Sequence, residues 1–560
     1  MLKHPKAPLV LTLGTAAVLI AGGGAAYWYL SQPKAEPGDL LAGADVIPES
    51  ALMAMSLTTD AAQWQKLRQF GTTPSQKAFD QALAQVRDRL LTANGFDYQK
   101  DIQPWVGAEV TVAFLGNPPP FNAPPGSNAQ PAIAVLPIRD PAKAKQILEA
   151  PRSGSPLSDR NYKGFQIKEK KGGAGGGFSA TVLNGQYLVV TTDPKTTDQA
   201  IDSFVAKTTL SATPGYTTAF AQVKTPQPFG KVYVNVPAAA ALSAANAGKP
   251  PAATEGKPQT QGLAATVALQ PGGIRIQGVS WLKPNTGALT VQNNAKLMPS
   301  RLPAETILMV SGGNLQQFWR DYTQGQATSP LTPIDPKVIQ EGIQSTVGMN
   351  WEQDFLTWMN GEFAIALTGA PADSPAGLPF SVVVLAKAGD RRAAETALKK
   401  LDDAMVERYK FQVQETQVNE QPVITWTIPQ GGSLINRGWL DNDVAFLSVG
   451  APIASAMVPR PRTPLAESAA FKTAIADHVS PNNGHFFVNV EQALNTNRFP
   501  LFQLPPGNRD LVAAVKAIGV TAAIRDRQTI RYDVFASLQT TNNSQPLPAP
   551  TVPPSPSPSP

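Results

Sequence analysis

DYQKDIQPWVGAEVTVAFLG, residues Asp97–Gly116, matches NWEQDFLTWMNGEFAIALTG, residues Asn350–Gly369, without a gap. Three pairs of polar or aromatic side chains are identical in this match: Asp101 with Asp354, Trp105 with Trp358, and Glu109 with Glu362. We call these six residues the repeat signature. A long stretch that recurs once in a chain indicates an internal duplication, and a duplication decides how the rest of the sequence is divided.

Four further matches flank the repeat signature in the same order. They are IPESALMAMS at Ile47–Ser56 with LPAETILMVS at Leu302–Ser311, Ile133–Leu136 with Val382–Leu385, Lys231–Val236 with His485–Val490, and Gly273–Ile276 with Thr529–Tyr532. The separation drifts only from 253 residues at Trp105 and Trp358 to 256 at Arg275 and Arg531. We therefore predict two tandem homologous repeats, residues 45–295 and 296–540.

Each repeat is predicted to combine strands and helices. In the first, strands are expected at Leu52–Leu57, Glu109–Leu115 and Ala132–Ile138, and helices at Ala61–Phe70, Ser75–Leu91 and Pro141–Glu149, the last capped by Asp140. Three more strands should follow, the last two joined at Asn184-Gly185, a strong hairpin signal. Leu440–Asp443 takes that place in the second repeat, and a strand pair closes each repeat.

The closing strand of the second repeat, Thr529–Leu538, shows the clearest periodicity. Its residues Ile530, Tyr532, Val534, Ala536 and Leu538 alternate with Arg531, Asp533, Phe535 and Ser537. A period of two predicts a sheet with one face more buried than the other. Helices are too few for a parallel βαβ sheet, so the predicted fold class is α+β, with a mainly antiparallel sheet and packed helices in each repeat.

The N-terminal end of the chain carries a candidate membrane anchor. Leu9–Leu30 contains no charged residue and is long enough to cross the hydrocarbon core as a helix. Lys3 and Lys6 precede it. By the positive-inside rule, this predicts that residues 1–8 are cytoplasmic and that the chain after residue 30 lies on the opposite side of the membrane. A cleaved signal peptide is the alternative, since Gly24-Ala25-Ala26 offers small residues to a peptidase.

Two segments outside the repeats read as spacers. Residues 31–44 form a short tether after the anchor, and residues 541–560 form an uncharged Pro/Ser tail that should be disordered or extended. The predicted protein is therefore a single-pass membrane protein whose bulk lies outside the cytoplasm.

Composition excludes several classes of function. The chain of 560 residues has no cysteine, which rules out disulfides, thiolate metal sites and a cysteine nucleophile. The net charge is only +6, and the Lys and Arg residues are dispersed rather than gathered with aromatic residues, so no nucleic-acid partner is expected.

The segment Ile47–Gly116 resembles an uncharacterised cyanobacterial family, catalogued as domain of unknown function 3352. The most specific part of the likeness is the Asp-x-x-x-Trp-x-x-x-Glu pattern of the repeat signature, which occurs twice. The second copy has Asn360 where the first has Gly107, so this glycine is not required in both. The resemblance extends over roughly residues 5–540. It implies a bacterial source, in which the bulk of the chain would lie in the periplasm or the thylakoid lumen, and it brings no known activity.

No motif identifies a catalytic, cofactor-binding or metal site. His478 and His485 lack the spacing of a zinc site, and His485 aligns with Lys231. The glycine-rich run Gly172–Gly177 lacks the Gly-Lys-Ser/Thr ending of a phosphate loop.

The carboxylates of the repeat signature could in principle form an acid–base pair. Their recurrence in both repeats favours a structural role instead. In that interpretation the aspartates cap a short helix, the tryptophans are buried and the glutamates begin a strand.

The leading hypothesis is a membrane-anchored extracytoplasmic binding or scaffold protein, with an envelope protein as its partner. The alternatives are an envelope-acting hydrolase with an unidentified carboxylate site and a carrier of lipid or pigment. An exposed apolar patch would favour the first, ionisable groups of perturbed pKa in a cleft the second, and an apolar cavity the third.

Overall fold

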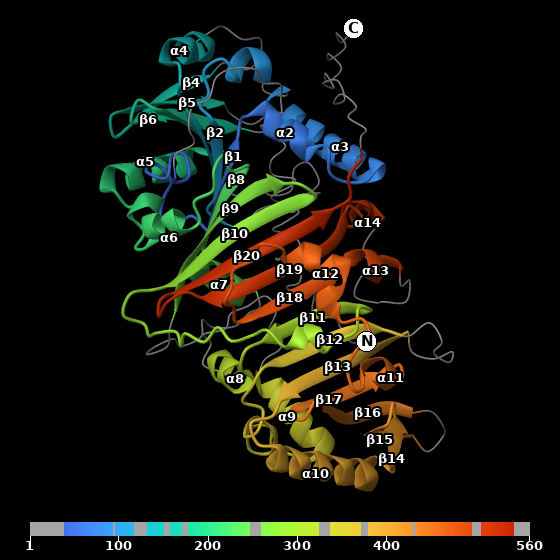
Figure 1. The fold of residues 1–560 in the computed structure, drawn as a ribbon. Helices are drawn as coiled ribbons and strands as arrows, with labels where there is room; N and C mark the ends of the chain where they lie inside the picture. Colours follow the sequence, from blue (N-terminus) through green and yellow to red (C-terminus); the bar gives the residue numbers. More distant parts are fainter. Residues whose placement is uncertain are drawn as a thin grey trace, which may run out of the picture. The chain divides into compact units, whose positions relative to one another are not determined.

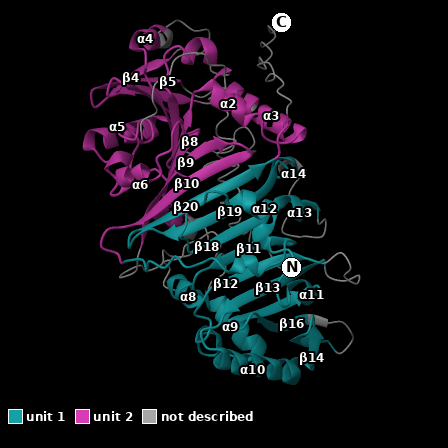
Figure 2. Cartoon of the chain, in the orientation of Figure 1, with its two compact units in different colours: residues 1–9, 288–538 teal, residues 10–287, 539–560 magenta. Residues whose placement is uncertain are grey.

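The computed structural model describes residues 39–92, 96–116, 131–149, 157–170, 177–246, 259–323, 336–370, 379–428, 433–495 and 506–541. These residues form two compact units (Figure 2). The N-terminal unit contains residues 39–287 with 539–541, and the C-terminal unit contains residues 288–538.

The described part of the N-terminal unit mixes strands and helices (Figure 1). The strands are β1 (Met53–Thr58), β2 (Glu109–Phe114), β3 (Ala132–Pro137), β4 (Ser158–Tyr162), β5 (Phe165–Lys170), β6 (Phe178–Leu183), β7 (Tyr187–Thr191), β8 (Gly230–Asn235), β9 (Thr260–Gln270) and β10 (Gly273–Leu282). The helices are α2 (Ala61–Leu67), α3 (Thr73–Leu90), α4 (Pro141–Glu149), α5 (Pro194–Ala206), α6 (Tyr216–Gln222) and α7 (Val236–Asn246).

The C-terminal unit also contains both strands and helices over its described residues. The strands are β11 (Thr306–Gly312), β12 (Phe363–Gly369), β13 (Phe380–Lys387), β14 (Gln412–Val418), β15 (Gln421–Thr427), β16 (Ser433–Leu440), β17 (Val444–Gly450), β18 (Gly484–Asn489), β19 (Val515–Ile524) and β20 (Thr529–Leu538). The helices are α8 (Leu315–Thr323), α9 (Pro336–Val347), α10 (Arg391–Tyr409), α11 (Ala454–Met457), α12 (Ala469–Ile475), α13 (Val490–Asn495) and α14 (Pro506–Val512).

Hydrogen bonding joins the strands of each unit in one order. In the N-terminal unit the order is β4-β5-β6-β7-β3-β2-β1-β8-β9-β10. In the C-terminal unit it is β14-β15-β16-β17-β13-β12-β11-β18-β19-β20. Every pair in these two series is antiparallel, which confirms the predicted α+β class with a mainly antiparallel sheet.

Turn chemistry explains why the predicted hairpins form. Asn184 and Gly185, between β6 and β7, have φ of 54° and 63°, as a two-residue hairpin turn requires. Asp441 takes φ of 54° between β16 and β17. The predicted count of three strands from α4 to the end of the Asn184-Gly185 hairpin is wrong, because the described residues form four there, β4 to β7. The additional one is β4, an edge strand of sequence SDRNY that lacks the apolar alternation used to recognise strands.

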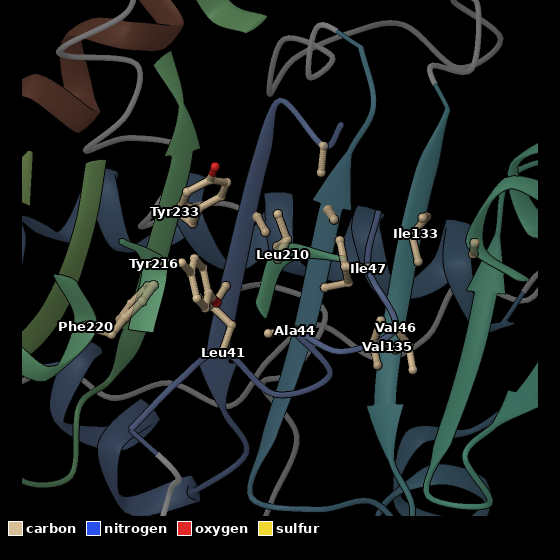
Figure 3. Packing of buried hydrophobic residues seen from close by; sticks show 14 of the residues in the cluster. Leu41, Ala44, Val46, Ile47, Ile133, Val135, Leu210, Tyr216, Phe220 and Tyr233 are labelled. Atoms are coloured by element: carbon tan, nitrogen blue, oxygen red, sulfur yellow. The ribbon is translucent and has the colours of Figure 1, made fainter. Parts of the chain in front are cut away.

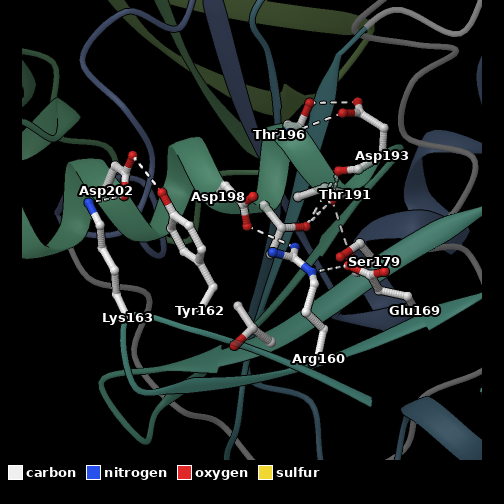
Figure 4. Close-up of polar contacts among 12 residues, drawn as sticks. Arg160, Tyr162, Lys163, Glu169, Ser179, Thr191, Asp193, Thr196, Asp198 and Asp202 are labelled. Carbon is white, nitrogen blue, oxygen red and sulfur yellow. Dashed lines mark hydrogen bonds and ion pairs between the residues drawn. The ribbon is translucent and has the colours of Figure 1, made fainter. Parts of the chain in front are cut away.

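Helix α5 was not predicted, and polar contacts hold it against β4 and β5 (Figure 4). Arg160 on β4 donates to Glu169 at 2.6 Å and to Asp198 on the helix at 2.8 Å. One turn further along the helix, Asp202 accepts from Lys163 at 2.6 Å and from Tyr162 at 3.3 Å. These contacts join the helix to an edge of the sheet that has little apolar surface.

The N-cap of α5 is Asp193, and its removal should measurably destabilise the N-terminal unit. One carboxylate oxygen accepts from Thr196 N at 3.0 Å and the other from Thr196 Oγ1 at 2.6 Å. Partial burial raises the pKa of Asp193, but the hydrogen bonds from Thr196, together with those from Thr192 and Lys195, outweigh it and lower the pKa. We expect Asp193→Ala to cost about 1 kcal/mol of unfolding free energy in urea titrations at neutral pH.

The same variant has a defined pH dependence. Because the folded pKa of Asp193 is depressed, the stabilisation is present above the ordinary value of 3.8 and is lost as the pH falls through the lower folded pKa. Asp193→Asn, which keeps a capping oxygen, is the matched control and should lose less. Equal losses for both variants would contradict the capping role.

In each unit, the segment that leads into the first strand packs on the sheet. We call residues 39–46 and 293–300 the entry segments. In the first, Leu41, Ala44 and Val46 are buried in a core that also contains Val135 and Tyr216 (Figure 3). In the second, Met298 occupies the core of the C-terminal unit. The entry segments are therefore parts of the two folds over the residues described.

The predicted anchor at residues 9–30, most of the tether and the tail from residue 542 lie outside the described residues. Among the residues that are described, no helix combines the length and apolar character needed to cross a membrane.

Candidate functional site

The repeat signature of the N-terminal unit begins in a single wide helical turn, Tyr98–Ile102. Its N-cap is Asp97, whose side chain accepts from Lys100 N at 3.0 Å. The prediction that Asp101 caps this turn is therefore corrected: Asp101 instead bonds back to Asp97 N through Oδ2 at 2.7 Å. Trp105 is fully buried and donates from Nε1 to Asp101 O at 2.6 Å.

The C-terminal unit repeats this arrangement. Asn350 is the N-cap of the wide turn Trp351–Leu356, and Asp354 Oδ2 accepts from Asn350 N at 2.7 Å. Trp358 Nε1 donates to Asp354 O at 3.0 Å. Although burial raises the pKa of Asp354, its hydrogen bond with Lys400 at 2.8 Å helps to lower it below the ordinary value. The cap prediction for Asp354 is corrected in the same way as for Asp101.

Glu109 is the first residue of β2 and belongs to a buried ion pair. Lys231 on β8 donates to Glu109 Oε1 at 2.6 Å, and the two side chains are only 3% and 7% exposed. Ser56 on β1 donates to Glu109 Oε2 at 2.7 Å. Lys231 also donates to Leu40 O at 3.0 Å, so the pair holds the entry segment.

Glu362, directly before β12, holds the second entry segment without a lysine. Its Oε2 accepts from Lys296 N at 2.9 Å and from Leu297 N at 2.6 Å. Both glutamates therefore fix the point at which the chain enters a unit. Their hydrogen bonds are made within the protein, which favours positioning of the chain over acid–base chemistry.

A buried polar row crosses the sheet of the N-terminal unit. Strand register aligns Thr111, Ser56, Lys231, Thr266 and Gln277 across β2, β1, β8, β9 and β10. The first four of these residues are buried. Thr111 donates to Ala42 O in the entry segment at 2.7 Å. The row is thus a chain of polar side chains beneath the entry segment.

The C-terminal unit has a corresponding polar row with different chemistry. Register and hydrogen bonds align Ser311, His485, Thr521 and Asp533 across β11, β18, β19 and β20. Ser311 Oγ accepts from His485 N at 3.1 Å. Here His485 stands where Lys231 stands in the other unit, and Asp533 stands where Gln277 stands.

Both histidines of the described residues meet at one hydroxyl. His478 Nδ1 lies 2.6 Å from Thr521 Oγ1, and His485 Nδ1 lies 2.9 Å from the same oxygen. A hydroxyl has one proton, so it donates to one imidazole and accepts from the other. Burial lowers the pKa of His485 to about 4, so its imidazole is neutral at pH 7.

Each unit contains a pocket beside its entry segment. In the N-terminal unit a pocket of about 590 Å³ is lined by Glu109, Asp45, Tyr187 and Arg139, among others. Burial and the Asp45 carboxylate raise the pKa of Tyr187. In the C-terminal unit a pocket of about 520 Å³ is lined in part by His485 and by residues of the entry segment.

Sequence reasoning did not find Lys231, Ser56 or Thr521 as partners of these groups. The matched strands Lys231–Val236 and His485–Val490 did contain the signal, since each begins with a polar residue in an apolar run. No cluster of ligands suited to a metal ion occurs in the part of the chain that the structure describes.

Comparison with known proteins identifies a family but no function. No curated protein matches the chain. Two similar solved structures are crystal forms IV and I of TP0453, each 8% identical with a TM-score of 0.23 over 44% of this chain. The matches cover 82% and 80% of those chains, and a likeness this low supports no statement about fold or function.

The family model described as protein of unknown function (DUF3352) matches residues 12–538. This match covers nearly the whole chain and confirms the resemblance carried by the repeat signature. The chain belongs to the DUF3352 family.

Proposed function

We propose that this chain is a membrane-anchored extracytoplasmic binding protein with a scaffold role, built from two homologous repeats behind a transmembrane helix at residues 9–30. Its bulk would lie in the periplasm or thylakoid lumen of a cyanobacterium, and its partner would be another envelope protein. The charge distribution around residues 9–30 supports this orientation.

The repeat architecture is supported by equivalent structure at equivalent positions. The strand orders β4 to β10 and β14 to β20 correspond one to one. Trp105 and Trp358 donate to the carbonyl oxygen four residues earlier, and Glu109 and Glu362 hold the two entry segments. Independent origins would not be expected to reproduce such details.

The observation that carries the binding role is an apolar surface on the sheet of the C-terminal unit. We call it the apolar face, and it consists of Val310, Ile365, Val382, Val384, Leu447, Val449, Phe486, Val520 and Val534. None of these side chains is fully buried, and Ile365, Val382 and Val449 are 47%, 40% and 42% exposed. Contiguous exposed apolar surface marks interaction sites.

On β20 the polar row lies on the buried side of the sheet, together with Phe535. Asp533 and Ser537 are buried, whereas Val534 and Ala536 on the opposite face are only half-buried. Successive side chains of a strand point to opposite faces, so the polar row and the apolar face lie on the two sides of one sheet. The side chains of β20 alternate between the two faces as predicted, but those that belong to the apolar face stay partly exposed to solvent.

A protein surface suits the apolar face better than a small apolar ligand. The face is spread across neighbouring strands, whereas a lipid or pigment carrier encloses its ligand in an apolar cavity. Helices α8 and α10 already cover one end of the face near Phe363, which shows that helices can pack on it through their apolar side chains. A partner presenting a similar element would complete this layer.

Site-specific crosslinking tests the proposal. A photo-reactive amino acid at Val382 or Val449 in the full-length chain should capture a defined protein partner in native membranes. The matched control is Val406 on α10, which is 43% exposed but lies outside the apolar face. Val382→Asp should reduce recovery of the partner by about tenfold or more, because it buries a charge in the contact.

Three outcomes would contradict the proposal. They are equal crosslinking from Val406 and Val382, adducts with lipid alone, and adducts only between copies of this chain. The first would show that capture is not specific to the apolar face, and the other two would name an occupant other than a separate envelope protein.

A further inference from the structure

The pocket beside His485 has a composition distinct from its counterpart in the N-terminal unit. Its polar lining includes Asn294, Lys296, Ser480, Asn482 and His485. No carboxylate occurs among the described residues that line it, although Asp39, Asp45 and Glu109 all line the other pocket. Its lining is therefore rich in hydrogen-bond donors and carries one fixed positive charge.

Several of these groups have no partner among the residues that the structure describes. Lys296 and Asn294 are exposed, and neither side chain makes a hydrogen bond or ion pair among the described residues. His485 uses Nδ1 on Thr521, and its Nε2 has no hydrogen-bond partner in the described part of the chain. Asn482 uses Oδ1 to accept from Gly484 N at 3.1 Å, which leaves its amide N–H₂ for a ligand.

The contact with Thr521 can fix the tautomer of His485 in which Nε2 carries the proton and can donate a hydrogen bond. If the Thr521 hydroxyl donates to His485 Nδ1, the neutral imidazole carries its proton on Nε2. The same hydroxyl then accepts from His478 Nδ1, 2.6 Å away. One consistent hydrogen-bond arrangement therefore presents an N–H group from His485 in a pocket that already contains the Lys296 ammonium.

We propose that this pocket binds a small organic anion, with Lys296, His485 and the amides of Asn294 and Asn482 receiving its carboxylate or phosphate oxygens. Charged and neutral N–H donors form their strongest hydrogen bonds with oxyanions. The volume of about 520 Å³ exceeds that of a bare ion, and the apolar side chains of Phe471 and Ile475 line the rest of the pocket.

This site is separate from the apolar face. His485 and Phe486 are consecutive residues of β18, so their side chains lie on opposite sides of the sheet. Loss of ligand binding would leave crosslinking from Val382 unchanged, and failure to find a protein partner would leave ligand binding unchanged. The two proposals therefore fail independently.

The test is direct binding of succinate to the purified full-length chain in detergent, measured by calorimetry, with inorganic phosphate and glucose as competitors. Succinate is the probe for an organic anion. We expect saturable binding that glucose does not displace. Lys296→Met should weaken it by about tenfold or more, because the fixed charge is lost.

Two further variants separate ligand binding from folding. His485→Asn keeps a polar group near Thr521 but removes the atom at Nε2, so it should weaken binding while Thr521 keeps a partner. Lys399→Met removes an exposed lysine on α10, outside the pocket, and should leave affinity unchanged. If His485→Asn fails to fold, the exposed Lys296 variant still decides the question.

The proposal would be overturned by no saturable binding of succinate, by affinity that Lys296→Met leaves unchanged, or by equal competition from glucose. Binding of phosphate without binding of succinate would also overturn it, because it would show a site for the bare ion.

Discussion

Replacing Lys231 by methionine is expected to lower the free energy of unfolding by about 3–5 kcal/mol, since the change leaves a buried carboxylate without its cation. Glu109 is 7% exposed and, among the described side chains, would keep the hydrogen bond from Ser56 at 2.7 Å. Methionine preserves most of the apolar stem of lysine, so the loss reports the charge rather than a cavity. Urea unfolding followed by circular dichroism measures it.

The location of the effect can be checked by hydrogen exchange. Lys231 lies on β8 and bonds to the entry segment at Leu40, so β1, β2, β8 and residues 39–46 should lose protection first. A general loss over both units would indicate misfolding rather than removal of the ion pair.

Two controls complete this prediction. Lys168→Met breaks a pair with Asp159 in which both side chains are well exposed, and it should cost about 0–1 kcal/mol. The double variant Lys231→Met with Glu109→Leu removes both charges and should recover most of the loss, to within about 2 kcal/mol of the unaltered chain. A double variant no more stable than Lys231→Met would contradict the charge argument.

Much of the architecture could be predicted because it follows from local patterns. Asn184-Gly185 is a turn whose backbone angles few other residues adopt, and Asp140 accepts from Lys143 N at 3.0 Å as the predicted cap of α4. The antiparallel sheet followed from many short strands with few helices between them.

The elements that were missed have weak patterns or an overlooked one. Strand β4 reads SDRNY, and its place at a sheet edge removes the need for an apolar face. Helix α5 does carry a start signal in Asp193-Pro194, where a capping aspartate precedes proline at the first helical position. That signal is as clear as the one read at Asp140-Pro141.

The polar rows could not be predicted because they depend on register between distant strands. Ser56, Glu109 and Lys231 are spread over 175 residues of sequence and meet only after β1 pairs with β2 and β8. The polar row of one unit does not predict that of the other, since His485 stands in the place of Lys231 and backbone N–H groups take the place of the lysine as partners of Glu362. The same frame therefore supports two different polar interiors.

The differences between the two units help to separate residues that stabilise the fold from residues that can bind a ligand. Positions that are equal in both units, such as the two signature tryptophans, serve the shared frame. Positions that differ, such as Lys231 and His485, stabilise the two units through different contacts, so the side chain at such a position can also take part in binding. The proposed anion pocket contains one of these differing positions, as expected if one repeat has acquired a ligand that the other does not bind.

Trp358→Ala should therefore act as a structural lesion, with a loss of about 3–5 kcal/mol in the C-terminal unit. The side chain is 1% exposed, and its Nε1 donates to Asp354 O at 3.0 Å. Alanine would leave a large cavity beside Phe355 and Met359, which belong to the same core. Denaturant unfolding gives the total loss, and hydrogen exchange in β12, β13 and α10 assigns it to this unit.

Trp105→Ala is the matched variant, because Trp105 is fully buried in the N-terminal unit and makes the equivalent hydrogen bond at 2.6 Å. Its loss should be similar in size but should appear in β2 and β3. If either tryptophan instead served ligand recognition, its variant would keep full stability and lose only binding. Comparable losses in separate units would show that the repeat signature stabilises the fold of each unit, and would leave binding to the surfaces that differ between the two.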